Sequence, residues 1–200
     1  MRVDIGQETD PGDPVLEIPW ADPDNAANAY IDVKHRPEAA LELVECRRFP
    51  ALGLFLTRVN SAAMPFRTAK CDAWATTDLD LEERIAYPLP CKVGSYVDLL
   101  IDRADLNSHA EPYQKLGALL AQRLKDSKAH AQIEMFIRRC LFTLEDRWGY
   151  CATVFVHAYG ANPREAESEW NEVIGSLGES LDAISREFGW GGARSSPHNS

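Results

Sequence analysis

The sequence has little positive charge, few cysteines and no long apolar run. Its 200 residues hold 21 Lys and Arg against 31 Asp and Glu, which gives a formal net charge of −10. No short stretch gathers five or six basic residues, so binding to a phosphate backbone or to anionic lipid is disfavoured. No apolar run is long enough to cross a bilayer, and the N-terminus lacks the apolar segment of a signal peptide. We therefore expect a cytoplasmic protein that binds neither nucleic acid nor membrane.

The cysteines also lack the spacing that disulfide frameworks and zinc sites need. There are five of them, an odd number, and they are scattered without a CxxC pair, at Cys46, Cys71, Cys91, Cys140 and Cys151. Reduced thiols in the core are the expectation. The nucleotide-binding, zincin and serine-hydrolase signatures GxxxxGK[ST], GxGxxG, HExxH and GxSxG are absent too. We expect no cofactor and no metal.

What the sequence does contain is alternation between strand and helix patterns, which predicts an α+β fold. Period-two segments are followed by amphipathic helices, as in two β-β-α units. The expectation is a two-layer structure, with an antiparallel sheet of four or more strands and helices packed on one face. An additional N-terminal helical segment is expected at 37–60. The predicted strands are 68–77, 93–102, 131–143 and 148–159, and the predicted covering helices are 107–126 and 162–188.

Composition divides the chain into three parts. Residues 1–28 are rich in Asp and Pro and are predicted to form an irregular extension. Residues 29–189 form a single α+β domain, and 190–200 form a disordered tail. The final helix has the clearest signals, because Asn162 can cap it, Pro163 suits its first turn and Gly189 suits its end.

The two faces of the predicted strands differ in character. One face is uniformly apolar and needs helices over it. The other, which we call the mixed face, combines rings with charges. Its candidate ligand or interface residues are Trp74, Tyr96, Phe136, Arg138, Phe155 and Tyr159. The mixed face is interpreted in three ways: as a subunit interface, as the lining of a pocket, or as a surface covered by residues 37–60.

His157 is the strongest candidate for chemistry, since it lies in the middle of a strand on the mixed face. With Glu134 or Asp98 beside it, it could act as a general acid or base, Arg138 could hold an anionic substrate, and the loop 78–92 could be a lid. The competing interpretation is a structural histidine. A metal site at His130 and Glu134 is disfavoured, because four residues of strand separate them by about 13 Å.

A faint repeat relates the two units. Gly94–Asn107 overlays on Gly149–Asn162 without a gap, and the overlay matches Asp98 with Thr153. The alternative explanation is that any two segments that lead from a strand into a helix resemble each other. A real duplication would place a cleft or an interface at the centre of the sheet.

The sequence therefore favours a non-enzymatic module that binds a small molecule or a protein and acts as a homo-oligomer, in the simplest case a homodimer. The alternative is a small enzyme that uses His157 with Glu134 or Asp98. The two differ in whether these side chains converge in an open pocket.

Overall fold

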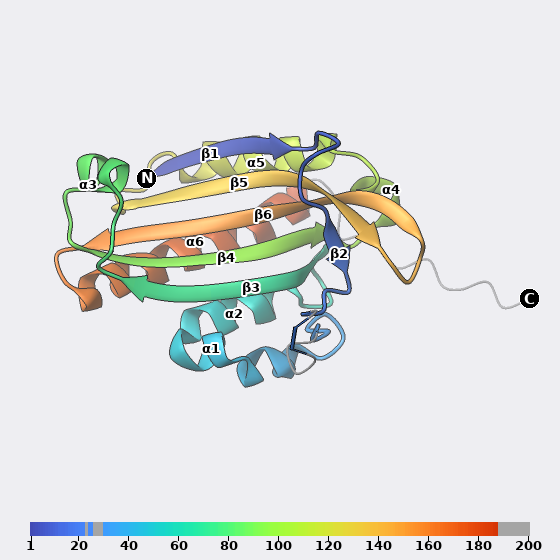
Figure 1. Cartoon of the computed structure of the whole chain (residues 1–200), viewed down its shortest axis with the longest axis horizontal. Helices are drawn as coiled ribbons and strands as arrows, with labels where there is room; N and C mark the ends of the chain where they lie inside the picture. Colours follow the sequence, from blue (N-terminus) through green and yellow to red (C-terminus); the bar gives the residue numbers. More distant parts are fainter. Residues whose placement is uncertain (23, 26–29, 188–200) are drawn as a thin grey trace, which may run out of the picture.

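The computed structural model describes residues 1–22, 24–25 and 30–187 (Figure 1). The predicted disordered tail, 190–200, lies outside these residues. None of the described helices is both long and apolar enough to cross a bilayer. The elements in chain order are β1 (Arg2–Glu8), β2 (Leu16–Ile18), η1 (Pro37–Glu42), α1 (Val44–Arg48), α2 (Pro50–Val59), β3 (Phe66–Thr76), α3 (Leu81–Ala86), β4 (Cys91–Ile101), α4 (Ala104–Asn107), α5 (Glu111–Leu124), β5 (Ala131–Phe142), β6 (Arg147–Gly160) and α6 (Pro163–Glu187).

The α+β prediction is confirmed, but the sheet is mixed rather than antiparallel. Its main path is β1-β5-β6-β4-β3, and the short β2 also pairs with β5. The pairs β3–β4, β4–β6 and β5–β6 are antiparallel, whereas β1 and β2 run parallel to β5. The parallel strands come from residues 1–28, the segment expected to be irregular. The physical reason is that β5 has a free edge, and Arg2–Glu8 pairs with it in a register that sends Val3 and Ile5 to the helix side.

The longer helices α2, α5 and α6 lie on one side of the sheet (Figure 1), whereas the short α3 lies against the other face. α6 packs across β6 and β4 and contacts both α5 and α2. Trp170 of α6 is fully buried, and its Nε1–H donates to Ser95 Oγ of β4 at 3.0 Å. Phe49, just before α2, contacts the same ring edge-on at 5.6 Å. One indole therefore connects the N-terminal helices, the last helix and the centre of the sheet.

Residues 37–60 leave the mixed face uncovered. They form η1, α1 and α2, and they pack against α6 and beside β3. Of the three interpretations of the mixed face, the one in which this segment covers it is not what the structure shows. The apolar stripe of α2, with Leu52, Phe55 and Leu56, is instead buried in the helix layer.

The two β-β-α units meet at the centre of the sheet, where β4 and β6 pair from Cys91–Gly160 to Leu99–Ala152. Asp98 and Thr153, matched in the sequence overlay, are direct partners in this ladder. Beyond its end Tyr113 of α5 bridges the two strands, because its hydroxyl accepts from Ile101 N at 3.0 Å and donates to Tyr150 O at 2.8 Å.

Replacing Trp170 with Ala removes the indole that joins these layers, so we expect a loss of about 3–5 kcal/mol in the free energy of unfolding. Urea denaturation followed by circular dichroism measures it. Trp148→Ala is the matched control, since that indole is 57% exposed, and the expected change is about 0.5 kcal/mol or less. Equal losses in the two variants would contradict the packing described for α6.

Candidate functional site

The mixed face is open at its centre and covered at both ends. At one end the N-terminal segment covers a small second apolar cluster formed by Ile18, Leu100, Cys140, Phe142 and Cys151. At the other end α3 approaches the sheet, and Tyr87 stacks on Tyr159 with ring centroids 4.1 Å apart. The segment 78–92, interpreted as a loop and, in the enzyme alternative, as a candidate lid, thus contains a short helix that contacts the sheet.

A row of half-buried rings occupies the open centre. Phe155 of β6 contacts Tyr96 of β4 at 5.7 Å and Phe136 of β5 at 6.1 Å between ring centroids. His157 continues the row, with centroids 6.1 Å from both Phe155 and Trp74. These residues are neighbours because the strand registers place Tyr96 opposite Phe155 and Glu134 opposite Phe155. The structure therefore gathers the aromatic residues that the sequence assigned to this face.

Two glycines make room for the outer rings of this row. Trp74 lies opposite Gly94, and Phe136 lies opposite Gly6. A Cβ atom on either glycine would come within 2.7 Å or 2.8 Å of ring carbons of its partner. Each ring thus occupies space that any other residue would fill, a cross-strand pairing of glycine and aromatic ring that is known to stabilise sheets. For Gly94 the sequence signal was a lone glycine inside a strand pattern, which marks a close approach. Gly6 lies in the segment that was expected to be irregular, so no such signal was available there.

Between α3 and the sheet lies a cavity of about 640 Å³, which we call the α3 cavity. It falls in the size range of small-molecule sites. Glu83 holds α3 in place: it closes a capping box with Asp80, forms an ion pair with Lys92, and accepts from the Tyr159 hydroxyl at 3.1 Å. The lining residues are Arg2, Trp74, Asp80, Glu82, Glu83, Ala86, Tyr87, Lys92, Gln132, Glu134, Phe136, Phe155, His157 and Tyr159.

His157 and Glu134 both line the α3 cavity, and they are close without a hydrogen bond. His157 Nδ1 is 3.9 Å from Glu134 Oε2. Burial, with a smaller contribution from Lys92, lowers the pKa of His157 to about 4, so its imidazole is neutral at pH 7. Burial, reinforced by the nearby carboxylate of Asp4, raises the pKa of Glu134. At neutral pH this histidine is a weak base.

The other two residues proposed for chemistry lie elsewhere on the face. Asp98 is 4% exposed and accepts from the Thr153 hydroxyl at 2.5 Å. Burial raises its pKa, although the Thr153 hydrogen bond opposes the shift. Asp98 is four positions along β4 from Gly94, the partner of His157, so about 13 Å of strand separates the two. Arg138 Nε is engaged by Glu8 Oε2 at 2.7 Å. The structure therefore joins His157 with Glu134 but not with Asp98 or Arg138.

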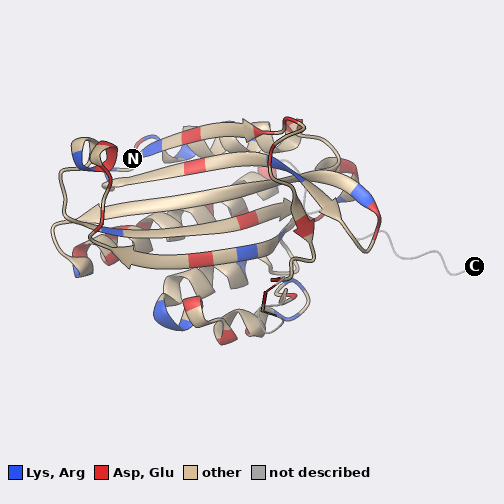
Figure 2. Ribbon diagram, viewed as in Figure 1, with Lys and Arg blue, Asp and Glu red and all other residues tan. Residues whose placement is uncertain are grey.

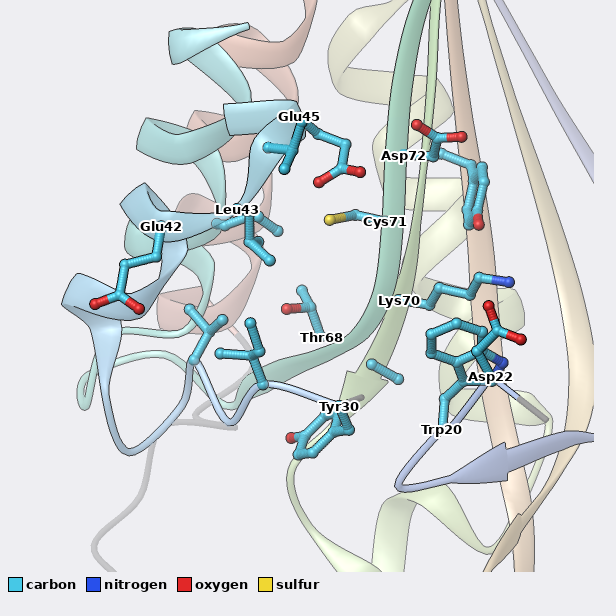
Figure 3. Close-up of a pocket in the computed structure, with 16 residues that line it drawn as sticks. Trp20, Asp22, Tyr30, Glu42, Leu43, Glu45, Thr68, Lys70, Cys71 and Asp72 are labelled. Carbon is cyan, nitrogen blue, oxygen red and sulfur yellow. The ribbon is translucent and has the colours of Figure 1, made fainter. Parts of the chain in front are cut away.

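A second cavity of about 490 Å³ lies at the edge of the sheet, between β3 and the segment containing η1 and α1 (Figure 3). Figure 3 shows Lys70 and Cys71 leaving β3 in opposite directions, Cys71 toward Leu43 and Lys70 toward Trp20. Lys70 Nζ lies 4.3 Å from the Trp20 ring centroid, a cation–π contact supplied within the chain. Burial raises the pKa of the Cys71 thiol far above its ordinary value, which keeps it protonated and unreactive.

Charges of both signs are interspersed over the molecule in the view of Figure 2, and basic residues do not form a face of their own there. Among the described residues, no three His, Cys, Asp or Glu side chains come together as metal ligands would.

The lowered pKa of His157 has a consequence for stability. The unfolded chain takes up this proton near pH 6.5, whereas the folded protein does so only near pH 4, so stability falls as the pH drops through this window. The slope from one such proton is up to about 1.4 kcal/mol per pH unit. We expect His157→Asn to flatten the pH dependence of the urea midpoint between pH 6.5 and 4. His109→Asn, at an exposed histidine, is the control, and an unchanged slope in His157→Asn would contradict the burial of the imidazole.

No protein-family model, no curated protein and no solved structure matches the chain.

Proposed function

We propose that this protein is a non-enzymatic module that binds a small molecule in the α3 cavity and acts as a homo-oligomer. The observation that carries the proposal is the coincidence of two features. Four of the five aromatic residues assigned to the mixed face from sequence line a cavity of about 640 Å³, namely Trp74, Phe136, Phe155 and Tyr159, and α3 closes one end of it. Concave sites lined by rings, with a few polar groups for orientation, are where small ligands bind.

The chemistry of the cavity favours binding over catalysis. A general base needs a pKa near the working pH and a partner that orients it. His157, with a pKa of about 4 and no hydrogen bond to Glu134, has neither. The enzyme alternative would need His157, Arg138 and a carboxylate to converge, and Arg138 is paired with Glu8 on β1 instead.

Ligand binding is tested by native mass spectrometry of protein purified under non-denaturing conditions, followed by an NMR screen of neutral, anionic and cationic fragments. We expect a bound molecule whose retention is lost in Phe155→Ala, because Phe155 contacts three other rings of the row. Trp148→Ala, on the same strand but outside the cavity, should retain it. Absence of any retained mass, together with no fragment that perturbs resonances of the cavity, would contradict the proposal.

The proposal of a homo-oligomer is based on a different surface, away from the α3 cavity. Leu41, Val44 and Leu54 are 61%, 73% and 70% exposed, and they lie on η1, α1 and α2, three elements in mutual contact. Large apolar side chains clustered on one exposed surface are typical of protein interfaces. We propose that a second copy of the chain covers them.

Leu54→Lys places a charge on this surface, so we expect it to convert the oligomer to a monomer in size-exclusion chromatography with light scattering. Leu144→Lys is the control, since Leu144 is 86% exposed but lies in the β5–β6 turn. A monomeric wild-type protein at tens of micromolar, or equal effects of the two variants, would refute this part of the proposal.

A further inference from the structure

Negatively charged side chains outnumber positively charged ones in the lining of the α3 cavity. Its lining includes four carboxylates, on Asp80, Glu82, Glu83 and Glu134, and two cations, on Arg2 and Lys92. Both cations already form ion pairs within the chain. Arg2 pairs with Asp4 at 2.7 Å, and Lys92 pairs with Glu83.

Glu134 is the carboxylate on the floor of the cavity that, among the described residues, forms no ion pair with a Lys or Arg side chain, although the charges of Arg2 and Lys92 act on it from a greater distance. In the part of the chain that the structure describes, its ion-pair partner is His157, 3.9 Å away, and that imidazole is neutral. Its side chain is 31% exposed, so it is partly removed from water and remains accessible from the cavity. A carboxylate in this position gains from a cation supplied by a ligand.

Aromatic rings line the same cavity as this carboxylate. Phe155 lies directly across from Glu134 in the β5–β6 ladder, and His157 contacts both Phe155 and Trp74. Phe136 is two positions along β5 and is seated over Gly6. The faces of such rings attract organic cations, and a set of rings around a carboxylate is the chemistry that recognises alkylammonium groups.

The chain itself shows this preference at the other cavity. Lys70 Nζ sits 4.3 Å from the Trp20 centroid and 5.9 Å from that of Tyr96, so there the protein provides the ammonium between its own rings. The α3 cavity has rings and a carboxylate in a comparable setting, and in the described chain the ammonium of Lys92 is paired with Glu83 rather than with Glu134.

We propose that the α3 cavity binds a small organic cation, with the ammonium group between Glu134 and the rings of Trp74, Phe136 and Phe155. This deepens the ligand-binding function proposed above and rests on it. Inorganic cations are the less suitable occupants, because they prefer a shell of oxygen ligands. Asp4, the carboxylate opposite Glu134 on β1, is already paired with Arg2, and Trp74, Phe136 and Phe155 contribute rings to the lining.

The test is isothermal titration calorimetry with choline, with spermidine and with dimethylbutanol, the uncharged carbon isostere of choline. We expect choline or spermidine to bind with a millimolar or lower Kd and dimethylbutanol to bind at least about tenfold more weakly, since it lacks only the charge. Indole N–H signals in NMR spectra, with the Trp74 signal assigned by its loss in Trp74→Phe, report whether the cation reaches the cavity.

Two variants with the same change in net charge separate a local effect from a general one. Glu134→Gln should weaken cation binding by about tenfold or more. Glu179→Gln should leave it unchanged, because Glu179 is 73% exposed on α6 and pairs with Arg58 outside the cavity. Trp74→Leu should weaken the binding of choline, with circular dichroism used to verify that the variant is folded at the temperature of the titration.

The outcomes distinguish the two proposals. If neither choline nor spermidine binds, or if dimethylbutanol binds as well as choline, the cation assignment is overturned. If in addition an anionic or neutral fragment perturbs the cavity resonances, the ligand-binding function stands with another ligand class. If no fragment of any class reaches the cavity, both proposals fall. Equal losses of cation binding in Glu134→Gln and Glu179→Gln would mean that the cation is attracted by the net charge of the protein and not by Glu134, which would overturn the proposed site.

Discussion

The pairing of β4 with β6 is the constraint on which the rest of the structure depends. It joins the two β-β-α units in antiparallel register and so decides which side chains share a face. Ser95 and its neighbours of the same parity meet Trp170 and the helix layer, while Tyr96 and Phe155 are brought together on the other side. A shift of one residue in this ladder would exchange the two faces of a whole strand, removing the core and the row of rings together.

Glycines shape the open centre of the mixed face as much as the aromatic rings do. Trp74 and Phe136 are held where Gly94 and Gly6 leave space, and these pairs come from both sides of the central ladder. α3 then closes one end through a single carboxylate, Glu83, which connects its own helix cap to Lys92 and Tyr159. No residue of α3 is buried, and Leu81 and Ile85 are 73% and 74% exposed. The helix is therefore held by polar contacts and ring stacking rather than by a core of its own.

Local signals in the sequence predicted the central elements well, because periodicity and caps act over a few residues. The last helix begins at Pro163, as its cap predicted, and Trp170, Val173 and Leu177 are buried along it. The strands of the two units and the composition of the mixed face were also predictable. Residues 2–8 were not, since their strand exists through pairing with β5, more than 120 positions away. The pairings of rings with glycines, and the place of α3, likewise depend on register, which composition does not encode.

The edges of the sheet have a consequence for aggregation. On one edge a one-residue bulge between Thr68 and Cys71 interrupts β3, and on the other the seven-residue β1 and three-residue β2 are separated by the chain from 9 to 15. Interrupted edges are poor templates for adding a strand from another molecule. The edges of the sheet therefore disfavour polymerisation by strand addition.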